Sequence, residues 1–302
     1  MSTWRRSLDA AGIREAGLRR DYSGRRRTVA RFRRTAYIAT RLLLPPSTLP
    51  HAVVATAFMH HADNLLDTGP KDERAAAWDA WERRVRNALR TGTSEDPLLR
   101  AMSHTVTVRP RMREAVETYL TTAVAELDFT GFTDEADYQT YVDAYVLPAF
   151  MLVATLVGPE DDDRAFRAAC RTFIDGSQRL DFVNDLAEDL QEGRLGIPAD
   201  TLERFCLTPE DIATNKYPDT ARSLIEYETA AARTLLRQAA GLPHLAPPPF
   251  RPLLGALVRI ELLTADAAMR RGTRLLRGPA SPSPAGALRV LSNARRDRRT
   301  SR

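Results

Sequence analysis

Three aspartates recur at every fourth position within residues 178–198, and they constrain the chain more than any other feature. They are Asp181, Asp185 and Asp189. On an α-helix this spacing places them in one slowly drifting stripe, and apolar neighbours such as Leu186 predict that the helix is partly buried. Carboxylates about 5–6 Å apart repel one another at low dielectric. A hard divalent cation such as Mg²⁺ would relieve the repulsion, because it prefers oxygen ligands.

A second aspartate pair, Asp63 and Asp67, follows the apolar run of residues 52–58 at the same spacing. A single pair of this kind is usually a solvated helix face. Two pairs on apolar helices, with Asn64 and Gln178 beside them, instead predict one pocket. In this pocket, Mg²⁺ ions would bridge the aspartates to a diphosphate.

Both segments resemble the aspartate-rich motifs of the squalene/phytoene synthase family. In the second segment the matching residues are Gln178, Asp185, Asp189, Gly193, Arg194 and Pro198. In the first segment they are Phe58, Asp63 and Asp67. The chain departs from the family pattern at Asp181, which stands for an Asn, at His60, which stands for an Arg, and at Asn64, which stands for an Asp. Weaker similarity extends over most of residues 37–277.

The resemblance implies an all-α, single-domain helical bundle of the isoprenoid-synthase type around a central cavity, with Mg²⁺ as cofactor. It assigns metal binding to Asp63, Asp67, Asp181, Asp185 and Asp189. It assigns catalysis to Asp63, Asp67, Asp185, Asp189 and His60. It assigns substrate binding to Tyr37, Arg41, Phe58, His60, Asn64, Tyr141, Gln178, Phe182 and Arg194.

Helical patterning between glycine and proline stops supports this fold class. The expected helices cover residues 35–44, 51–67, 71–91, 97–108, 111–128, 135–156, 161–191, 209–216, 219–240 and 251–277. Residues 1–34 hold 11 arginines against three acids, and we expect an arginine-rich arm that is solvated or closes over a diphosphate. Residues 35–278 form the expected prenyltransferase domain. Residues 279–302 begin with a low-complexity proline–serine stretch, so we expect a disordered tail.

The formal net charge of +5 resides in these two ends, because the remaining residues 35–278 carry 27 basic and 35 acidic groups. A nucleic-acid-binding protein would carry its basic stripe on the folded body, so nucleic acid is not an expected partner. No run reaches the ~18 apolar residues that a membrane span needs, and no apolar signal-peptide region opens the chain. We therefore expect a cytoplasmic protein, whose oligomeric state the sequence leaves open.

An allylic diphosphate ionises when its leaving group is neutralised, and the cation must then be kept from water. Candidates for an aromatic lining are Tyr37, Phe58, Tyr141, Tyr145, Phe150, Phe173 and Phe182. Typical family members join two prenyl diphosphates head to head. Because His60, Asn64 and Asn184 replace expected charged groups, we predict one allylic prenyl diphosphate, from dimethylallyl to farnesyl, and a small aromatic acceptor in secondary metabolism. The alternatives are a head-to-head squalene- or phytoene-type synthase and a non-catalytic helical binding protein.

Overall fold

The computed structural model describes residues 3–32, 34–161 and 163–300, and every regular element in these ranges is a helix. The first half contains α1 (Thr3–Ala10), α2 (Ala16–Phe32), α3 (Arg34–Leu43), α4 (Leu49–Asp67), α5 (Lys71–Thr91), α6 (Pro97–Val108), α7 (Met112–Thr122), η1 (Ala123–Asp128), α8 (Glu135–Tyr141), η2 (Val142–Val146) and α9 (Leu147–Ala154). The second half contains α10 (Arg164–Asn184), α11 (Leu186–Glu192), α12 (Ala199–Arg204), α13 (Pro209–Ala213), α14 (Pro218–Gln238), η3 (Ala239–Gly241), α15 (Leu242–Leu245), η4 (Pro248–Phe250), α16 (Arg251–Arg271), η5 (Gly272–Arg277) and α17 (Pro284–Thr300). The prediction of an all-α fold is confirmed.

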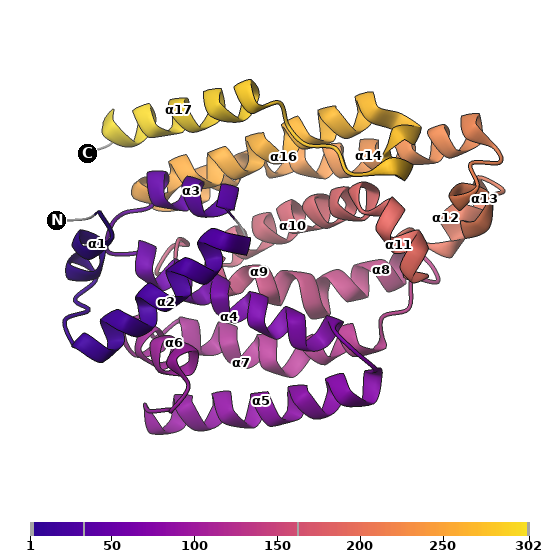
Figure 1. Cartoon of the computed structure of the whole chain (residues 1–302). Coiled ribbons are helices and arrows are strands. Elements are labelled where there is room, and N and C mark those ends of the chain that lie inside the picture. The colour runs from indigo at the N-terminus through magenta and orange to yellow at the C-terminus, as the bar shows by residue number, and fades with distance from the viewer. Residues whose placement is uncertain (1–2, 33, 162, 301–302) are drawn as a thin grey trace.

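Helix α10 lies in the middle of the bundle and packs against α9, α14 and α16. In Figure 1, α4 to α7 lie on one side of it, and α14, α16 and α17 lie on the other. One large apolar cluster runs through most of the helices, and Phe132, Tyr138 and Val142 form a smaller cluster beside it. The motif-bearing α10 is thus held from both sides.

Two of the expected helices, residues 71–91 and 97–108, coincide with α5 and α6. Helix α5 ends at Gly92, whose φ of 75° is the left-handed conformation that glycine adopts readily. Helix α6 begins after Asp96, whose side chain accepts a hydrogen bond from the backbone N–H of Leu98. The glycine that ends α5 is one of the stops that the sequence predicted.

Two expected helices are interrupted. Residues 135–156 form α8 and α9, separated by the π-helical turn η2. Pro148 follows directly and lacks the N–H that would bond to the carbonyl of Ala144, which favours a local change of helix type. Residues 161–191 break at Asp185, which ends α10 and precedes α11. Even so, the N–H of Asp185 bonds to the Asp181 carbonyl and that of Asp189 to the Asp185 carbonyl, so the four-residue spacing survives the break.

The expected arginine-rich arm is part of the bundle. Helix α2 packs against α4 and α6, and Tyr22 on it is fully buried. The Tyr22 hydroxyl hydrogen-bonds to Thr105 Oγ1 at 2.7 Å. Trp4 and Ile13 are also buried. The expectation of a solvated arm differs from the structure because a few large apolar residues, on α1, α2 and the turn between them, anchor the segment despite its arginines.

The expected disordered tail is also helical where the structure describes it. Helix α17 packs against α16 and α3. Ala294 is 3% exposed, and the Arg298 guanidinium donates a hydrogen bond of 2.6 Å to the carbonyl of Leu42. The proline–serine stretch is a short connector rather than the start of a disordered segment. Among the described residues, no helix combines the length and the apolarity that crossing a membrane requires.

Candidate active site

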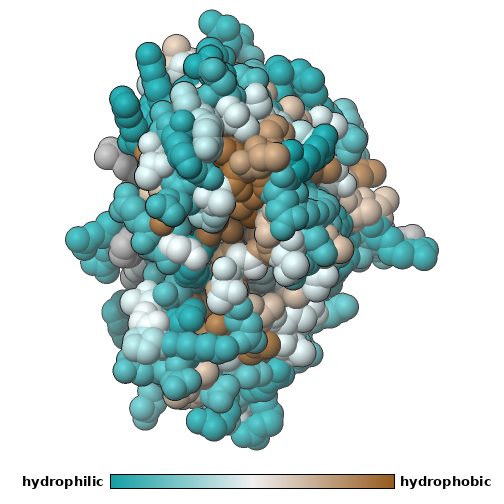
Figure 2. All heavy atoms as spheres, turned by 90° about the vertical axis from the view of Figure 1, so that its right-hand side faces the viewer, coloured by the Kyte–Doolittle hydropathy of each residue, from teal (hydrophilic) through white to brown (hydrophobic). Residues whose placement is uncertain are grey.

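The ends of α4 and α11 meet at the end of the bundle that lies at the right of Figure 1. A pocket of about 360 Å³ lies there. Its lining residues are Asp67, Thr68, Glu126, Phe129, Tyr141, Phe182, Glu188, Asp189, Glu192 and Arg194. Figure 2 looks onto this end of the molecule and shows an apolar hollow between polar rims. The two aspartate motifs, more than 100 residues apart in the sequence, therefore contribute to one site.

Asp67 is the last residue of α4. Its partial burial and the like charges of Asp63 and Glu126 raise its pKa from the usual 3.8 to about 7. Much of Asp67 remains open to solvent, so a ligand can reach it. Glu126, at the end of η1, is only 4% exposed, and burial raises the pKa of this carboxyl also. The neighbouring carboxyls thus disfavour the ionisation of Asp67 and Glu126 and create a demand for positive charge.

Arg194 supplies part of this charge. Gly193 ends α11 with φ of 67°, and its N–H bonds to the carbonyl of Asp189. This left-handed turn lets the chain fold back. The Arg194 guanidinium then donates a hydrogen bond of 2.8 Å to Glu126 Oε1 and lies 5.3 Å from the ring centre of Phe129. Arg194 is thereby oriented by both a carboxylate and an aromatic face.

Asp189 faces the same pocket from α11. Burial and the nearby charges of Asp185 and Glu192 raise its pKa to about 7. Its Oδ2 atom is buried without a hydrogen-bond partner. Buried polar atoms are nearly always paired in native proteins, so this orphaned oxygen indicates a site that a ligand completes.

Two tyrosine hydroxyls donate hydrogen bonds to carboxylates of this region. The Tyr145 hydroxyl donates a hydrogen bond of 2.7 Å to Asp63 Oδ1, and the Tyr141 hydroxyl donates one of 2.6 Å to Glu126 Oε2. Burial raises the pKa of both phenols well above 10. Both hydroxyls therefore keep their protons and remain hydrogen-bond donors at neutral pH.

The carboxylates of this region are oxygen ligands, which are the kind that Mg²⁺ requires. Within the described parts of the chain, no group of three or more His, Cys, Asp or Glu side chains is arranged closely enough to hold a metal by itself. The carboxylate pairs, the raised pKa values of Asp67 and Asp189 and the orphaned Asp189 oxygen nonetheless fit an oxygen-liganded divalent cation. Mg²⁺ commonly binds through one or two carboxylates and completes its shell with substrate phosphates, so the residues fit a cation that binds together with a diphosphate.

Other predicted site residues lie outside the lining of this pocket. Asp181 lies near the half-buried Glu261 of α16 and contributes to raising the pKa of Glu261, after the burial of Glu261 itself. The Asn64 amide contacts His60 Nε2 at 3.3 Å. Phe58 is buried and packs 4.8 Å from Trp81, ring centre to ring centre. Asp185 at the helix break, Gln178 on α10, and Tyr37 and Arg41 on α3 are likewise not among the lining residues. Their proposed roles stay predictions.

Glu126 is the clearest residue that sequence reasoning missed. It precedes Leu127 near the end of a helical segment, a position that looks like surface. Its burial and its bonds to Tyr141 and Arg194 emerge only from the packing of η1 against α4 and η2. Asn184 stands where the family pattern has an Arg, and its Oδ1 accepts a hydrogen bond from the Ala280 N–H, inside the protein.

Gly196 allows Phe182 to take its place in the pocket wall. A Cβ atom added at position 196 would lie 2.1 Å from Cδ1 of Phe182. We therefore expect Gly196→Ala to push the Phe182 ring out of place, with a destabilisation of about 1–3 kcal/mol and a higher KM for the prenyl substrate. Thermal unfolding and steady-state kinetics would measure both effects. Gly241→Ala is the matched control, because nothing lies within 4 Å of its added Cβ; equal effects of the two substitutions would contradict the prediction.

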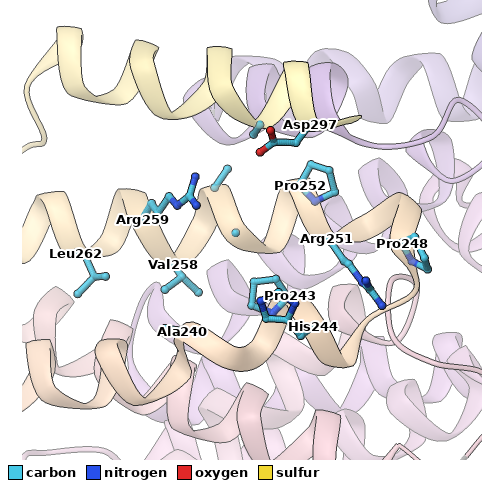
Figure 3. A pocket seen from close by; sticks show the side chains of 13 residues that line it. Ala240, Pro243, His244, Pro248, Arg251, Pro252, Val258, Arg259, Leu262 and Asp297 are labelled. Carbon is cyan, nitrogen blue, oxygen red and sulfur yellow. The ribbon is translucent and has the colours of Figure 1, made fainter. Parts of the chain in front are cut away.

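A separate pocket of about 450 Å³ lies between η3–α15, α16 and α17. Figure 3 shows Arg251, Arg259 and Asp297 around it. Its lining residues come from the described chain and include none of the predicted site residues. We therefore place the candidate active site at the aspartate pocket, although this second pocket is larger.

The all-helical bundle, with one aspartate of each motif lining a pocket at one end, defines a protein of the isoprenoid-synthase fold class. The squalene synthase HpnC from Alicyclobacillus acidocaldarius superposes with a TM-score of 0.74 at 24% identity, over 89% of this chain and 99% of that one. A dehydrosqualene synthase structure gives a TM-score of 0.77 at 17% identity, over 94% of this chain and 98% of that one. These likenesses establish the fold.

The chain belongs to the squalene/phytoene synthase family, whose model matches residues 29–285. It is 24% identical to the bifunctional protein CrtB/UppS of Streptomyces coelicolor over 275 residues, which cover 84% of this chain and 48% of that protein. It is 28% identical to the chloroplastic phytoene synthase 3 of Zea mays over 222 residues, which cover 69% of this chain and 50% of that protein. The chain thus spans about half the length of these curated relatives. Members of the family are prenyltransferases, and the family resemblance expected from the motifs is confirmed.

Proposed function

We propose that the protein is a Mg²⁺-dependent prenyltransferase that ionises one allylic prenyl diphosphate and transfers the prenyl group to a small aromatic acceptor. The observation that carries this proposal is the composition of the aspartate pocket. Among its ten lining residues, all within the described chain, Arg194 is the one cation, and it is bonded to Glu126. One diphosphate fits such a charge balance better than two.

When bound, Mg²⁺ would neutralise the leaving diphosphate and so favour cleavage of the allylic C–O bond. Asp67 and Asp189, which both line the pocket, would hold it, and Asp63 would remain fixed by Tyr145. Arg194 would orient the diphosphate by charge-assisted hydrogen bonds. Each of these roles uses a carboxylate or a guanidinium that the fold already positions.

Aromatic side chains of the pocket would contact the carbon atoms of the prenyl group that react. Phe129, Tyr141 and Phe182 form one wall, with ring centres of neighbours 5.2 to 6.4 Å apart. Their faces would exclude water and interact favourably with an allylic cation. The acceptor ring would then form the new C–C bond and release a proton. His60, the departing diphosphate or a free carboxylate could accept this proton.

Head-to-head synthesis is the second candidate. It is favoured by the names of the relatives, which include phytoene synthases from Zea mays and from Synechococcus elongatus. Product analysis separates the two functions. The protein would be incubated with Mg²⁺ and a prenyl diphosphate, with or without electron-rich phenols and indoles. A hydrocarbon formed from the diphosphate alone, at about 1 s⁻¹ or more, would refute aromatic transfer and establish the second candidate.

Metal dependence is a prediction that both candidates share. We expect activity to vanish when a chelator removes divalent cations and to return when Mg²⁺ is added in excess. The reason is that the acidic pocket repels a diphosphate unless cations neutralise it. Product formation followed by chromatography would measure this. Undiminished turnover in the chelator would contradict the assigned role of the aspartates.

A further inference from the structure

Aromatic side chains continue inward from Asp63 into the bundle. We call this series the aromatic plug. It consists of Tyr145 on η2, Tyr119 on α7, Trp78 and Trp81 on α5, and Phe58 on α4. Successive ring centres are 6.4, 6.2, 5.3 and 4.8 Å apart, starting from the pair Tyr145 and Tyr119. These separations are typical of packed aromatic pairs.

The aromatic plug is buried. Its members are between 0% and 8% exposed, and Tyr145 is the most exposed of them. Protein interiors of this kind are about as dense as organic crystals. The space directly below Asp63, between α4, α5 and α7, is therefore filled by side chains.

Tyr145 is the member of the aromatic plug that contacts the Asp63 carboxylate. Its hydroxyl is held by the 2.7 Å hydrogen bond to Asp63, and its ring lies 5.5 Å from that of Tyr141, which lines the pocket. The side chain is thus fixed between the diphosphate-binding aspartates and the interior of the bundle. A prenyl chain that followed the direction from Asp63 inward would meet the Tyr145 ring.

The size of the aspartate pocket sets a second limit. Its 360 Å³ is near the lower end of the roughly 300–1,000 Å³ that small-molecule sites occupy. A diphosphate and an acceptor would share this volume with the prenyl group. Little room remains for a long chain, and the inward direction is closed.

We propose that the aromatic plug restricts the allylic substrate to one or two isoprene units, as in dimethylallyl or geranyl diphosphate, and that Tyr145 is the residue that determines this specificity. The inference rests on the proposed transfer of a prenyl group and narrows its substrate. It is independent of the acceptor, because the plug lies below the aspartates.

The test compares kcat/KM for dimethylallyl, geranyl, farnesyl and geranylgeranyl diphosphates. The wild-type protein should prefer geranyl over geranylgeranyl diphosphate by at least about 100-fold, since a packed wall rejects surplus methylenes. Tyr145→Ala opens space next to Tyr119 and should reduce this preference by about 10-fold or more. Tyr119→Ala provides a second variant that opens the same plug if Tyr145→Ala does not fold.

Two controls separate ring volume from other effects. Tyr145→Phe removes the hydrogen bond to Asp63 but keeps the ring, so its chain-length preference should match that of the wild type. Phe166→Ala removes a ring that is 1% exposed near the start of α10, about 28 Å along the helix from Asp185. It should lower thermal stability to a similar degree while leaving the preference unchanged.

Binding measurements make the outcome independent of turnover. Titration calorimetry in Mg²⁺ with unreactive S-thiolodiphosphate analogues of geranyl and geranylgeranyl diphosphate would give the affinities. Tighter binding of the shorter analogue to the wild type, lost in Tyr145→Ala, supports the inference even if no product forms, in which case only the proposed function fails. Equal affinities or equal kcat/KM values in the wild type, an unchanged preference in Tyr145→Ala and Tyr119→Ala, or no binding of either analogue would overturn it.

Discussion

Replacing Asp67 by asparagine is expected to lower kcat/KM for the prenyl diphosphate by about 100- to 1,000-fold, the scale seen when one group that stabilises developing charge is removed. The substitution keeps the shape of the side chain but removes a carboxylate oxygen from the pocket that Asp189 also lines. Steady-state kinetics at saturating Mg²⁺ would measure the loss, and a higher Mg²⁺ requirement should accompany it.

The same Asp67→Asn substitution that lowers activity should increase the stability of the folded protein. The pKa of Asp67 is raised from 3.8 to about 7 in the folded protein, so the wild type loses stability as the pH rises through this range. Asp67→Asn lacks that titration and should gain stability relative to the wild type over the same interval. Asp128→Asn is the control, since Asp128 is 74% exposed and paired with Lys71. Wild-type kinetics in Asp67→Asn would exclude Asp67 from metal or diphosphate binding.

Replacing Arg179 by methionine is expected to lower the free energy of unfolding by about 3–5 kcal/mol, the usual cost of removing one partner from a buried ion pair. The Arg179 side chain is 9% exposed on α10. It forms ion pairs with Asp175 at 3.2 Å and Glu228 at 3.5 Å, and also with Glu135. Its guanidinium lies 4.2 Å from the ring centre of Tyr138. Without it, the buried Glu228 would lose its ion pair, and Asp175 would keep only its pair with Arg171 at 3.4 Å.

Denaturant unfolding would measure this effect, with Arg86→Met as the control. Arg86 is 46% exposed and pairs with Glu82 on the same helix, so its loss should cost less than about 1 kcal/mol. Because Arg179 ties α10 to α8 and α14, we also expect the activity of Arg179→Met to fall at temperatures where Arg86→Met is unaffected. Equal stabilities of the two variants would show that the Arg179 charges are solvated.

Local sequence signals predicted the helices that end at clear stops. Gly92 ends α5 at the expected residue, and Asp96 caps the start of α6 at the expected boundary, because capping is decided by a few neighbouring residues. The π-helical turn before Pro148 and the break at Asp185 were not predicted. The π-helical turn is favoured by Pro148, which lacks a backbone N–H, whereas the helical periodicity of residues 161–191 continues through Asp185 and gave no signal for the second break.

The chemistry of the candidate site could be predicted from the sequence, but not all of the residues that form it could be. The spacing of Asp63 with Asp67 and of Asp185 with Asp189 indicated two acidic helix faces, and the structure places Asp67 and Asp189 in one pocket. Glu126 gave no comparable signal, since a lone acid near a helix end is usually solvated. Only tertiary packing reveals that it is buried and oriented toward Arg194.

The contact between α3 and α17 has a consequence for biosynthesis. The hydrogen bond from Arg298 to the Leu42 carbonyl joins positions 256 residues apart. A nascent chain folds from its N-terminal part as it leaves the ribosome. The flank of α3 that contacts α17 therefore stays uncovered until almost 300 residues have been translated. During that interval a chaperone could bind this flank, and the bundle is completed only after α17 has left the ribosome.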